Sequence, residues 1–88
     1  MNFNTLPFDV VVRAYQKWLK ASYNYYYEEA FSDVEMSDEM WTGLGHYYKQ
    51  HLDKLPFLLE IGFTGNTLGV GVDKERLFQE AINPVIIL

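Results

Sequence analysis

The sequence predicts a small α+β domain: an antiparallel helical hairpin at the N-terminus, packed on a small antiparallel β-hairpin or three-stranded sheet with a short third helix. Two observations predict this class. Apolar residues recur at a helical period in the first half of the chain, whereas the second half holds short apolar runs separated by turn signals. With 88 residues, the chain is expected to form a single domain over residues 1–88.

The first helix is expected from about residue 7 to residue 29. Pro7 suits its first turn, because the N–H group that proline lacks has no intrahelical partner there. The predicted buried face follows the 3.6-residue period of an amphipathic helix. Its apolar positions are Phe8, Val11, Val12, Tyr15, Trp18, Leu19 and Tyr26.

The second helix is expected to begin at Ser37 and to continue until the next proline limits it. Ser37 offers a hydroxyl to the N–H groups of the first turn, and Asp38 and Glu39 place negative charge at the positive end of the helix. Two glycines, Gly43 and Gly45, lie inside it at a cost of roughly 1 kcal/mol each relative to alanine. A close approach of another backbone would explain them.

The stretch after Pro56 predicts two strands joined by a tight turn. Residues 57–63 and 68–72 form the strands, and the Thr-Gly-Asn-Thr sequence at 64–67 forms the turn. Alternation would place the apolar residues of the second strand on one face and its glycines on the other.

The chain is expected to end with a short helix and an apolar segment. Asp73 is the predicted N-cap of a helix over residues 74–82, which Pro84 stops. Residues 85–88 are too apolar for a free tail, so they should add a third strand or dock on the core. The open sheet edge and this apolar end favour a homodimer, because such surfaces tend to be covered.

The composition argues against several kinds of partner and chemistry. The formal net charge of −5 provides no basic field for a phosphate backbone, which argues against nucleic acid as a partner. The absence of cysteine excludes disulfides, a thiolate nucleophile and a cysteine-type zinc site. No apolar run is long enough to span a membrane, and the N-terminus lacks the pattern of a signal peptide. We therefore expect a soluble cytoplasmic protein that does not contact a membrane.

The segment between residues 23 and 41 is the most distinctive part of the sequence. It reads Tyr23-Asn24-Tyr25-Tyr26-Tyr27, then an acidic loop, then Met36-Ser37-Asp38-Glu39-Met40-Trp41. This pattern resembles the small helical N-terminal (Ia-type) domain of NAD-dependent DNA ligases, which grips the nicotinamide mononucleotide half of NAD. The resemblance covers roughly residues 14–52.

The resemblance implies a role for individual positions. Tyr25 and Tyr26 match the ligase tyrosine and the aromatic or histidine after it, and Asp38 matches the acid that opens the second helix. Trp41 stands where the family has tyrosine, and Thr42 replaces the second aspartate of the family. No lysine is followed by x-Asp-Gly, the pattern that carries the adenylated lysine of these ligases, so ligation by this chain is excluded.

The same segment is strongly acidic. No Lys or Arg occurs between Lys20 and Lys49, whereas six acids do: Glu28, Glu29, Asp33, Glu35, Asp38 and Glu39. Rings beside carboxylates can stack a flat cationic or aromatic ligand, and an acidic lobe can steer a basic protein or imitate nucleic acid. In the alternative interpretation the rings close a small core and the acids form a solvated face.

Catalysis is not expected. His46 and His51 are five residues apart, so on a helix they diverge and cannot share a metal ion. No nucleophile–base pair and no phosphate loop can be assembled either, so the sequence predicts neither an enzyme nor a cofactor.

Two function hypotheses remain. The first is a non-catalytic interaction module that engages a protein partner through its acidic, aromatic surface, and the resemblance adds a phage-type accessory or inhibitor role. Its candidate residues are Tyr25, Tyr26, Glu28, Glu29, Asp33, Glu35, Asp38 and Trp41. The second is a domain that binds a small nucleotide resembling nicotinamide mononucleotide, at Tyr25, Tyr26, Asp38 and Trp41.

Overall fold

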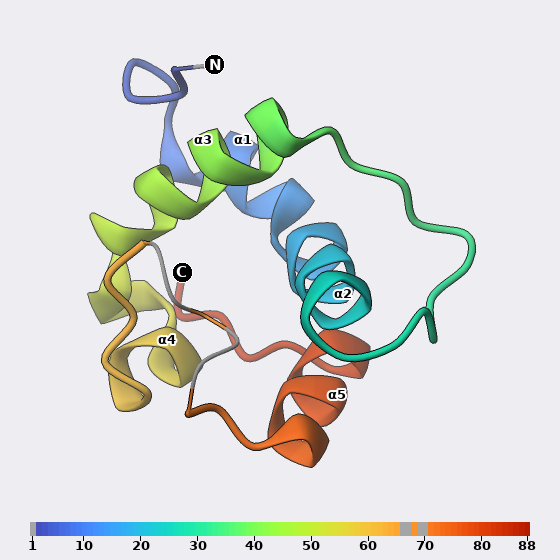
Figure 1. Ribbon diagram of the computed structural model, residues 1–88. Helices are drawn as coiled ribbons and strands as arrows, with labels where there is room; N and C mark the ends of the chain where they lie inside the picture. The colour runs from blue at the N-terminus through green and yellow to red at the C-terminus, as the bar shows by residue number, and fades with distance from the viewer. Residues whose placement is uncertain (1, 66–67, 69–70) are drawn as a thin grey trace.

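The computed structural model describes residues 2–65, 68 and 71–88, and over these residues the protein is helical without a strand (Figure 1). The predicted α+β class is therefore wrong. The elements in chain order are α1 (Phe8–Val11), the 3-10 turn η1 (Val12–Ala14), α2 (Tyr15–Tyr26), α3 (Asp38–Lys49), the 3-10 turn η2 (Leu52–Lys54), α4 (Pro56–Glu60) and α5 (Lys74–Ile82).

The predicted first strand is instead helix α4. Pro56 occupies its first turn, and Gly62 follows its end with a φ of 68°, a left-handed conformation that suits glycine. The N–H of Gly62 donates to the carbonyl of Leu59 at 3.2 Å, and that of Phe63 donates to the carbonyl of Leu58 at 3.0 Å. These two bonds form a Schellman motif, which satisfies the last carbonyls of the helix.

Among the residues that the structure describes, the other predicted strands are not observed either. Residues 66–67 of the turn and 69–70 of the second strand lie outside the described residues, and Leu68, which is described, is buried in the core. The end of the chain docks on the core without pairing as a strand: Ile86 packs against the core, and the Ile87 N–H donates to the carbonyl of Lys54 at 2.9 Å. The apolar side chains of Val85 and Ile87 remain about half exposed.

The predicted first helix is interrupted and shorter than expected. The N–H of Tyr15 donates to the carbonyl of Val12 instead of that of Val11, so the chain tightens to a 3-10 turn between α1 and α2. The carbonyl of Val11 accepts a hydrogen bond from the buried Tyr48 hydroxyl of α3 at 2.8 Å. A side chain that enters the backbone ladder in this way is a known cause of helix irregularity. Helix α2 then ends at Tyr26 instead of residue 29.

Helix α2 is the centre of the fold and packs against both α3 and α5 (Figure 1). Its fully buried Trp18 has ring contacts with Tyr15, Tyr48 and Phe63, at centroid distances of 6.2, 5.2 and 5.4 Å. The core is therefore built from large rings in edge-to-face and stacked contacts, which remove much surface from water for a small domain.

Both predicted helix caps are confirmed. The Ser37 hydroxyl accepts a hydrogen bond from the N–H of Met40 at 3.2 Å. The Asp73 carboxylate accepts from the N–H groups of Glu75 and Arg76, at 2.8 and 3.3 Å. Each cap satisfies N–H groups that have no partner inside their helix.

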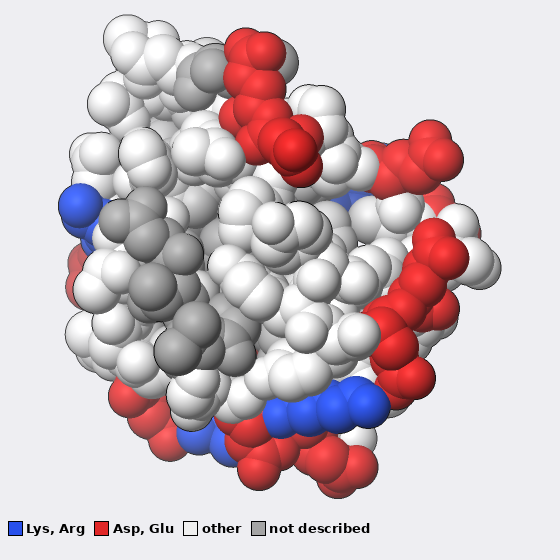
Figure 2. All heavy atoms as spheres, in the orientation of Figure 1, with Lys and Arg blue, Asp and Glu red and all other residues white. Residues whose placement is uncertain are grey.

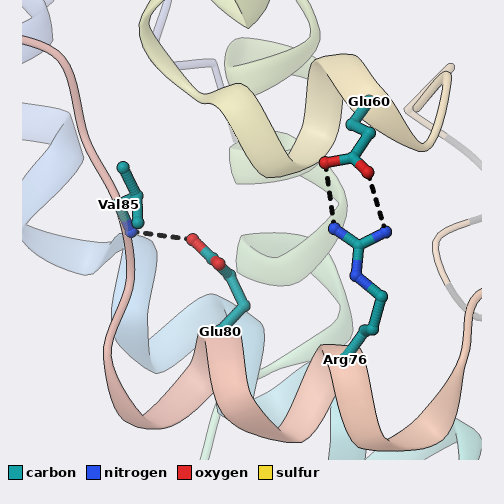
Figure 3. Close-up of polar contacts among 4 residues, drawn as sticks. All are labelled: Glu60, Arg76, Glu80 and Val85. Atoms are coloured by element: carbon teal, nitrogen blue, oxygen red, sulfur yellow. Dashed lines mark hydrogen bonds and ion pairs between the residues drawn. The ribbon is translucent and has the colours of Figure 1, made fainter.

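Helix α5 is tied to its neighbours by two carboxylates (Figure 3). The Arg76 guanidinium of α5 donates to both oxygens of Glu60 in α4, at 3.1 and 3.0 Å. The Glu80 carboxylate accepts from the N–H of Val85 at 2.7 Å and so holds the start of the C-terminal segment.

Gly45 lies where α3 approaches another backbone. A Cβ atom at this position would lie 3.5 Å from Trp18 Cζ2 and 3.6 Å from the carbonyl oxygen of Gly65, which are ordinary contact distances. We expect Gly45→Ala to raise the free energy of unfolding by about 0.5–1 kcal/mol, because alanine is the better helix former. Urea denaturation measures this change, with the bulkier Gly45→Val as the destabilised comparison. A loss of stability in the alanine variant would contradict the contacts described.

Candidate functional site

The three rings predicted for the site lie together at the junction of α2 and α3. The ring centroids of Tyr25 and Tyr26 are 5.1 Å apart, and those of Tyr25 and Trp41 are 5.4 Å apart. Tyr26 and Trp41 complete the cluster at 5.9 Å. Tyr25 is the outermost ring, with 70% of its surface exposed.

The Trp41 ring is held by hydrogen bonds that join α2 to α3. Its indole N–H donates to the hydroxyl of the buried Ser22 at 2.9 Å, and that hydroxyl donates to the carbonyl of Trp18 at 2.7 Å. The indole N–H of Trp18 donates back to the carbonyl of Trp41 at 3.0 Å. This ring of three bonds fixes the start of α3 against the middle of α2.

The loop over residues 27–37 is fixed to α2 as well. The Asn24 side-chain amide donates to the carbonyl of Phe31 at 2.9 Å and accepts from its N–H at 3.0 Å. The Phe31 ring stacks on Phe78 of α5 at 5.2 Å, and Val34 is buried. The N–H of Val34 donates to the Phe31 carbonyl at 3.1 Å. These contacts hold the loop in one position against α2 and α5.

An open hollow of about 720 Å³ lies between α2 and this loop, and we call it the acidic hollow. It is lined by Ala21, Asn24, Tyr25, Glu29, Val34, Glu35, Met36 and Ser37. Figure 2 shows red acidic side chains along the upper and right-hand parts of this face, where Figure 1 places the loop and the start of α3. Of the predicted site residues, the structure brings Tyr25, Glu29 and Glu35 together here.

The four residues predicted for a nucleotide pocket do not share this hollow. Tyr26 and Trp41 line a separate one of about 80 Å³, and Asp38 lies at a third one, with Glu39 and His46. Sites for small organic ligands usually enclose roughly 300–1,000 Å³. The hollow beside Trp41 is smaller than that range.

Asp33 lies on another side of the loop, beside basic side chains that sequence reasoning did not single out. We call this place the basic hollow, which has a volume of about 260 Å³. It is lined by Arg13, Gln16, Lys17, Lys20, Asp33 and Val34. The signal was present in the sequence: Arg13, Lys17 and Lys20 are spaced by four and three residues, the spacing of one helix face. The formal net charge of −5 does not reveal such a local cluster of positive charge.

Glu28 serves the structure of the loop. Its carboxylate lies 2.7 Å from the Lys74 ammonium of α5, and the Tyr23 hydroxyl donates to it at 3.4 Å. The hydrogen bond from Lys74, followed by the charge of Lys74, lowers the pKa of Glu28 below its usual 4.5. Because the folded-state pKa is the lower one, the pair stabilises the protein above about pH 4.5, and the contribution is lost as the pH falls through the folded-state pKa.

Replacing Glu28 with glutamine should therefore reduce the acid sensitivity of the fold. We expect the melting temperature of Glu28→Gln to fall less than that of the wild type between about pH 6 and about pH 3. High salt should shrink the difference, because the pair is exposed to solvent. Thermal scans by circular dichroism measure both effects. Equal pH profiles at low salt would show that the Lys74 contact has no energetic role.

Comparison with protein-family models, with curated proteins and with solved structures found no match. No helix in the described part of the chain combines the length and the apolar character needed to cross a membrane.

Proposed function

We propose that this protein is a non-catalytic interaction module that binds a basic segment of a protein partner in the acidic hollow. One observation carries the proposal: an exposed tyrosine and two carboxylates, Tyr25, Glu29 and Glu35, line one preformed hollow that has no Lys or Arg in its lining.

The lining suits a cationic side chain. The face of Tyr25 attracts a guanidinium or ammonium group through the ring quadrupole, and the carboxylates of Glu29 and Glu35 add attraction and accept hydrogen bonds. The hollow lies at the C-terminal end of α2, where the helix dipole is negative. The ring, the carboxylates and the helix dipole all favour a positively charged group in the hollow.

The loop over residues 27–37, which forms one side of the acidic hollow, is held in place without a partner. Asn24 binds the backbone of Phe31 in both directions, and the Phe31 ring is stacked on α5. Little conformational entropy is then lost when a ligand binds, which favours affinity for a given set of contacts. Acidic residues that serve only to interact with solvent would not require the loop to be fixed in this way.

Calorimetric titration with a short arginine-rich peptide, acetylated and amidated at its ends, tests the proposal. We expect saturable binding to the wild type and binding weakened at least threefold in the double variant Glu29→Gln/Glu35→Gln, which corresponds to about 0.6 kcal/mol or more. Tyr25→Leu keeps apolar bulk but loses the aromatic face, so it should also weaken binding.

A matched control separates the hollow from net charge. Asp9→Asn/Asp53→Asn also removes two negative charges, at exposed positions that do not line the hollow. We expect this control to bind like the wild type. If it weakens binding as much as the Glu29 and Glu35 double variant does, the attraction comes from net charge, and the proposed site is wrong.

The nucleotide-binding alternative and the phage-type accessory or inhibitor role rest on the ligase resemblance and stay predictions. A thermal-shift titration with nicotinamide mononucleotide, on the wild type and on Asp38→Ala, tests the first of them. Ligand at 100 times its dissociation constant adds about 2.7 kcal/mol to stability. A saturable shift that Asp38→Ala abolishes would favour the nucleotide site over the proposal made here.

A further inference from the structure

We infer that the segment recognised by this protein is bipolar: it carries a cationic group for the acidic hollow and an anionic group for the basic hollow beside it. The inference rests on the proposed function and names the chemistry of the partner. The observation behind it is that two hollows of opposite charge lie along one face of α2 and share one lining residue, Val34.

The helix spacing places the two hollows in line. Arg13, Lys17 and Lys20 line the basic hollow, and Ala21 and Asn24 line the acidic hollow. Lys17, Lys20 and Asn24 are three and four residues apart, the spacing of one face of α2, and Arg13 precedes them in the 3-10 turn η1. A partner that lies along this face meets both hollows.

Consecutive residues of the loop line different hollows. Val34 is buried and lines both of them, whereas its neighbours lie at different hollows, Asp33 at the basic one and Glu35 at the acidic one. Val34 therefore marks the boundary between the two charged regions.

The charges differ in sign at the two hollows. The basic hollow has three cations and one acid in its lining, and the acidic hollow has two acids and no cation. The Lys20 ammonium lies 5.4 Å from the centre of the Phe31 ring, a contact with a neutral side chain. Arg13 and Lys17 form no ion pair within the described part of the chain. Asp33 is one acid beside three cations, so a purely basic partner would leave most of this positive charge without a counter-charge.

The geometry also sets the spacing of the partner's charges. Lys17 lines the basic hollow and Asn24 lines the acidic hollow. They are seven residues apart, which is roughly 10 Å along the helix axis at 1.5 Å per residue. An extended peptide advances about 3.3 Å per residue. An acidic and a basic residue about three positions apart therefore match the two hollows.

Three synthetic peptides of equal length test the inference by calorimetry. The first carries one arginine, the second adds a glutamate three residues from it, and the third carries the glutamate next to the arginine. We expect the second to bind the wild type about twofold to fivefold more tightly than the first, the gain typical of one exposed ion pair. The third should gain less, because its charges are too close to reach both hollows.

Variants of the basic hollow identify where the gain arises. In Arg13→Gln/Lys17→Gln the first and second peptides should bind equally, whereas the control Lys49→Gln/Lys54→Gln should keep the gain. If no arginine peptide binds, the proposed function fails and the inference fails with it. If the first peptide binds at the acidic hollow and the second binds no more tightly, the inference alone is overturned.

A second copy of this chain is the competing occupant, because it carries both charges itself. Sedimentation velocity at low salt decides this point. We predict that any self-association, such as the homodimer expected from the sequence, does not depend on Arg13 and Lys17. Salt-sensitive oligomers that disappear in Arg13→Gln/Lys17→Gln would show that the two hollows join copies of this chain, and the inferred separate partner would be wrong.

Discussion

Replacing Tyr48 with phenylalanine should lower the free energy of unfolding by about 1–2 kcal/mol, whereas the same replacement at Tyr15 should raise it by up to about 1 kcal/mol. Both side chains are fully buried, and their rings pack edge to face at 5.2 Å. The Tyr48 hydroxyl donates to the carbonyl of Val11 at 2.8 Å. The Tyr15 hydroxyl has no hydrogen-bond partner among the described residues.

The opposite signs follow from the cost of burying a polar group. A buried hydroxyl that has lost its bonds to water destabilises the fold unless the protein supplies a partner, so removing the unpaired hydroxyl of Tyr15 relieves that cost. Burial raises the pKa of both phenols, as expected for groups that have left water. Urea denaturation of the two variants measures the difference, and equal changes in stability would contradict the hydrogen-bond assignment.

The second large effect is expected at Ser22, the hydroxyl that joins the two tryptophans. Ser22→Ala should cost about 1–3 kcal/mol, because the Trp41 indole N–H loses its acceptor and the carbonyl of Trp18 loses a donor. The contact also positions the Trp41 ring beside Tyr25. The variant should therefore loosen the ring cluster as well as the α2–α3 junction.

A double-mutant cycle isolates the bond between Ser22 and Trp41. Trp41→Phe removes the donor and keeps an aromatic ring, so the costs of Ser22→Ala and Trp41→Phe should not add. We expect a coupling free energy of about 0.5–1.5 kcal/mol from denaturation of the single and double variants. Additive costs would show that the indole bond does not stabilise the junction.

The starts of the two capped helices were predictable from the sequence, whereas the ends of the first two predicted helices were not: α2 ends at Tyr26 and α3 at Lys49, before the residues expected. Ser37 and Asp73 cap α3 and α5 as expected, because a capping side chain bonds N–H groups of the helix turn that directly follows it. The interruption after Val11 was not predictable, since it depends on Tyr48, which lies far along the chain. Local patterns do not reveal such long-range contacts.

The sheet was predicted wrongly because a short apolar run fits a buried strand and a buried helix equally well. The decisive signal was Pro56 at the start of the run and Gly62 just after its end, the usual asymmetry of a short helix. The Thr-Gly-Asn-Thr sequence at 64–67, which is typical of a β-turn, favoured the strand interpretation instead.

The site was predictable in part. The rings of Tyr25, Tyr26 and Trp41 do meet at the bend between the two helices, where hydrogen bonds hold Trp41 against α2. Which residues share a hollow was not predictable, since it depends on where the loop contacts α2. Asn24 and Val34 set that contact, and neither carries a charge or a motif that would draw attention to it.

The central claim is that the loop is fixed against α2, so that the acidic hollow exists before a partner binds. Amide hydrogen exchange at Phe31, followed by NMR, tests it most directly, because this N–H donates to the Asn24 side chain at 3.0 Å. We predict slow exchange in the wild type and faster exchange in Asn24→Ala, with the amides in the middle of α2 still protected. Exchange of the wild-type Phe31 amide at the rate of an unfolded chain would contradict the claim.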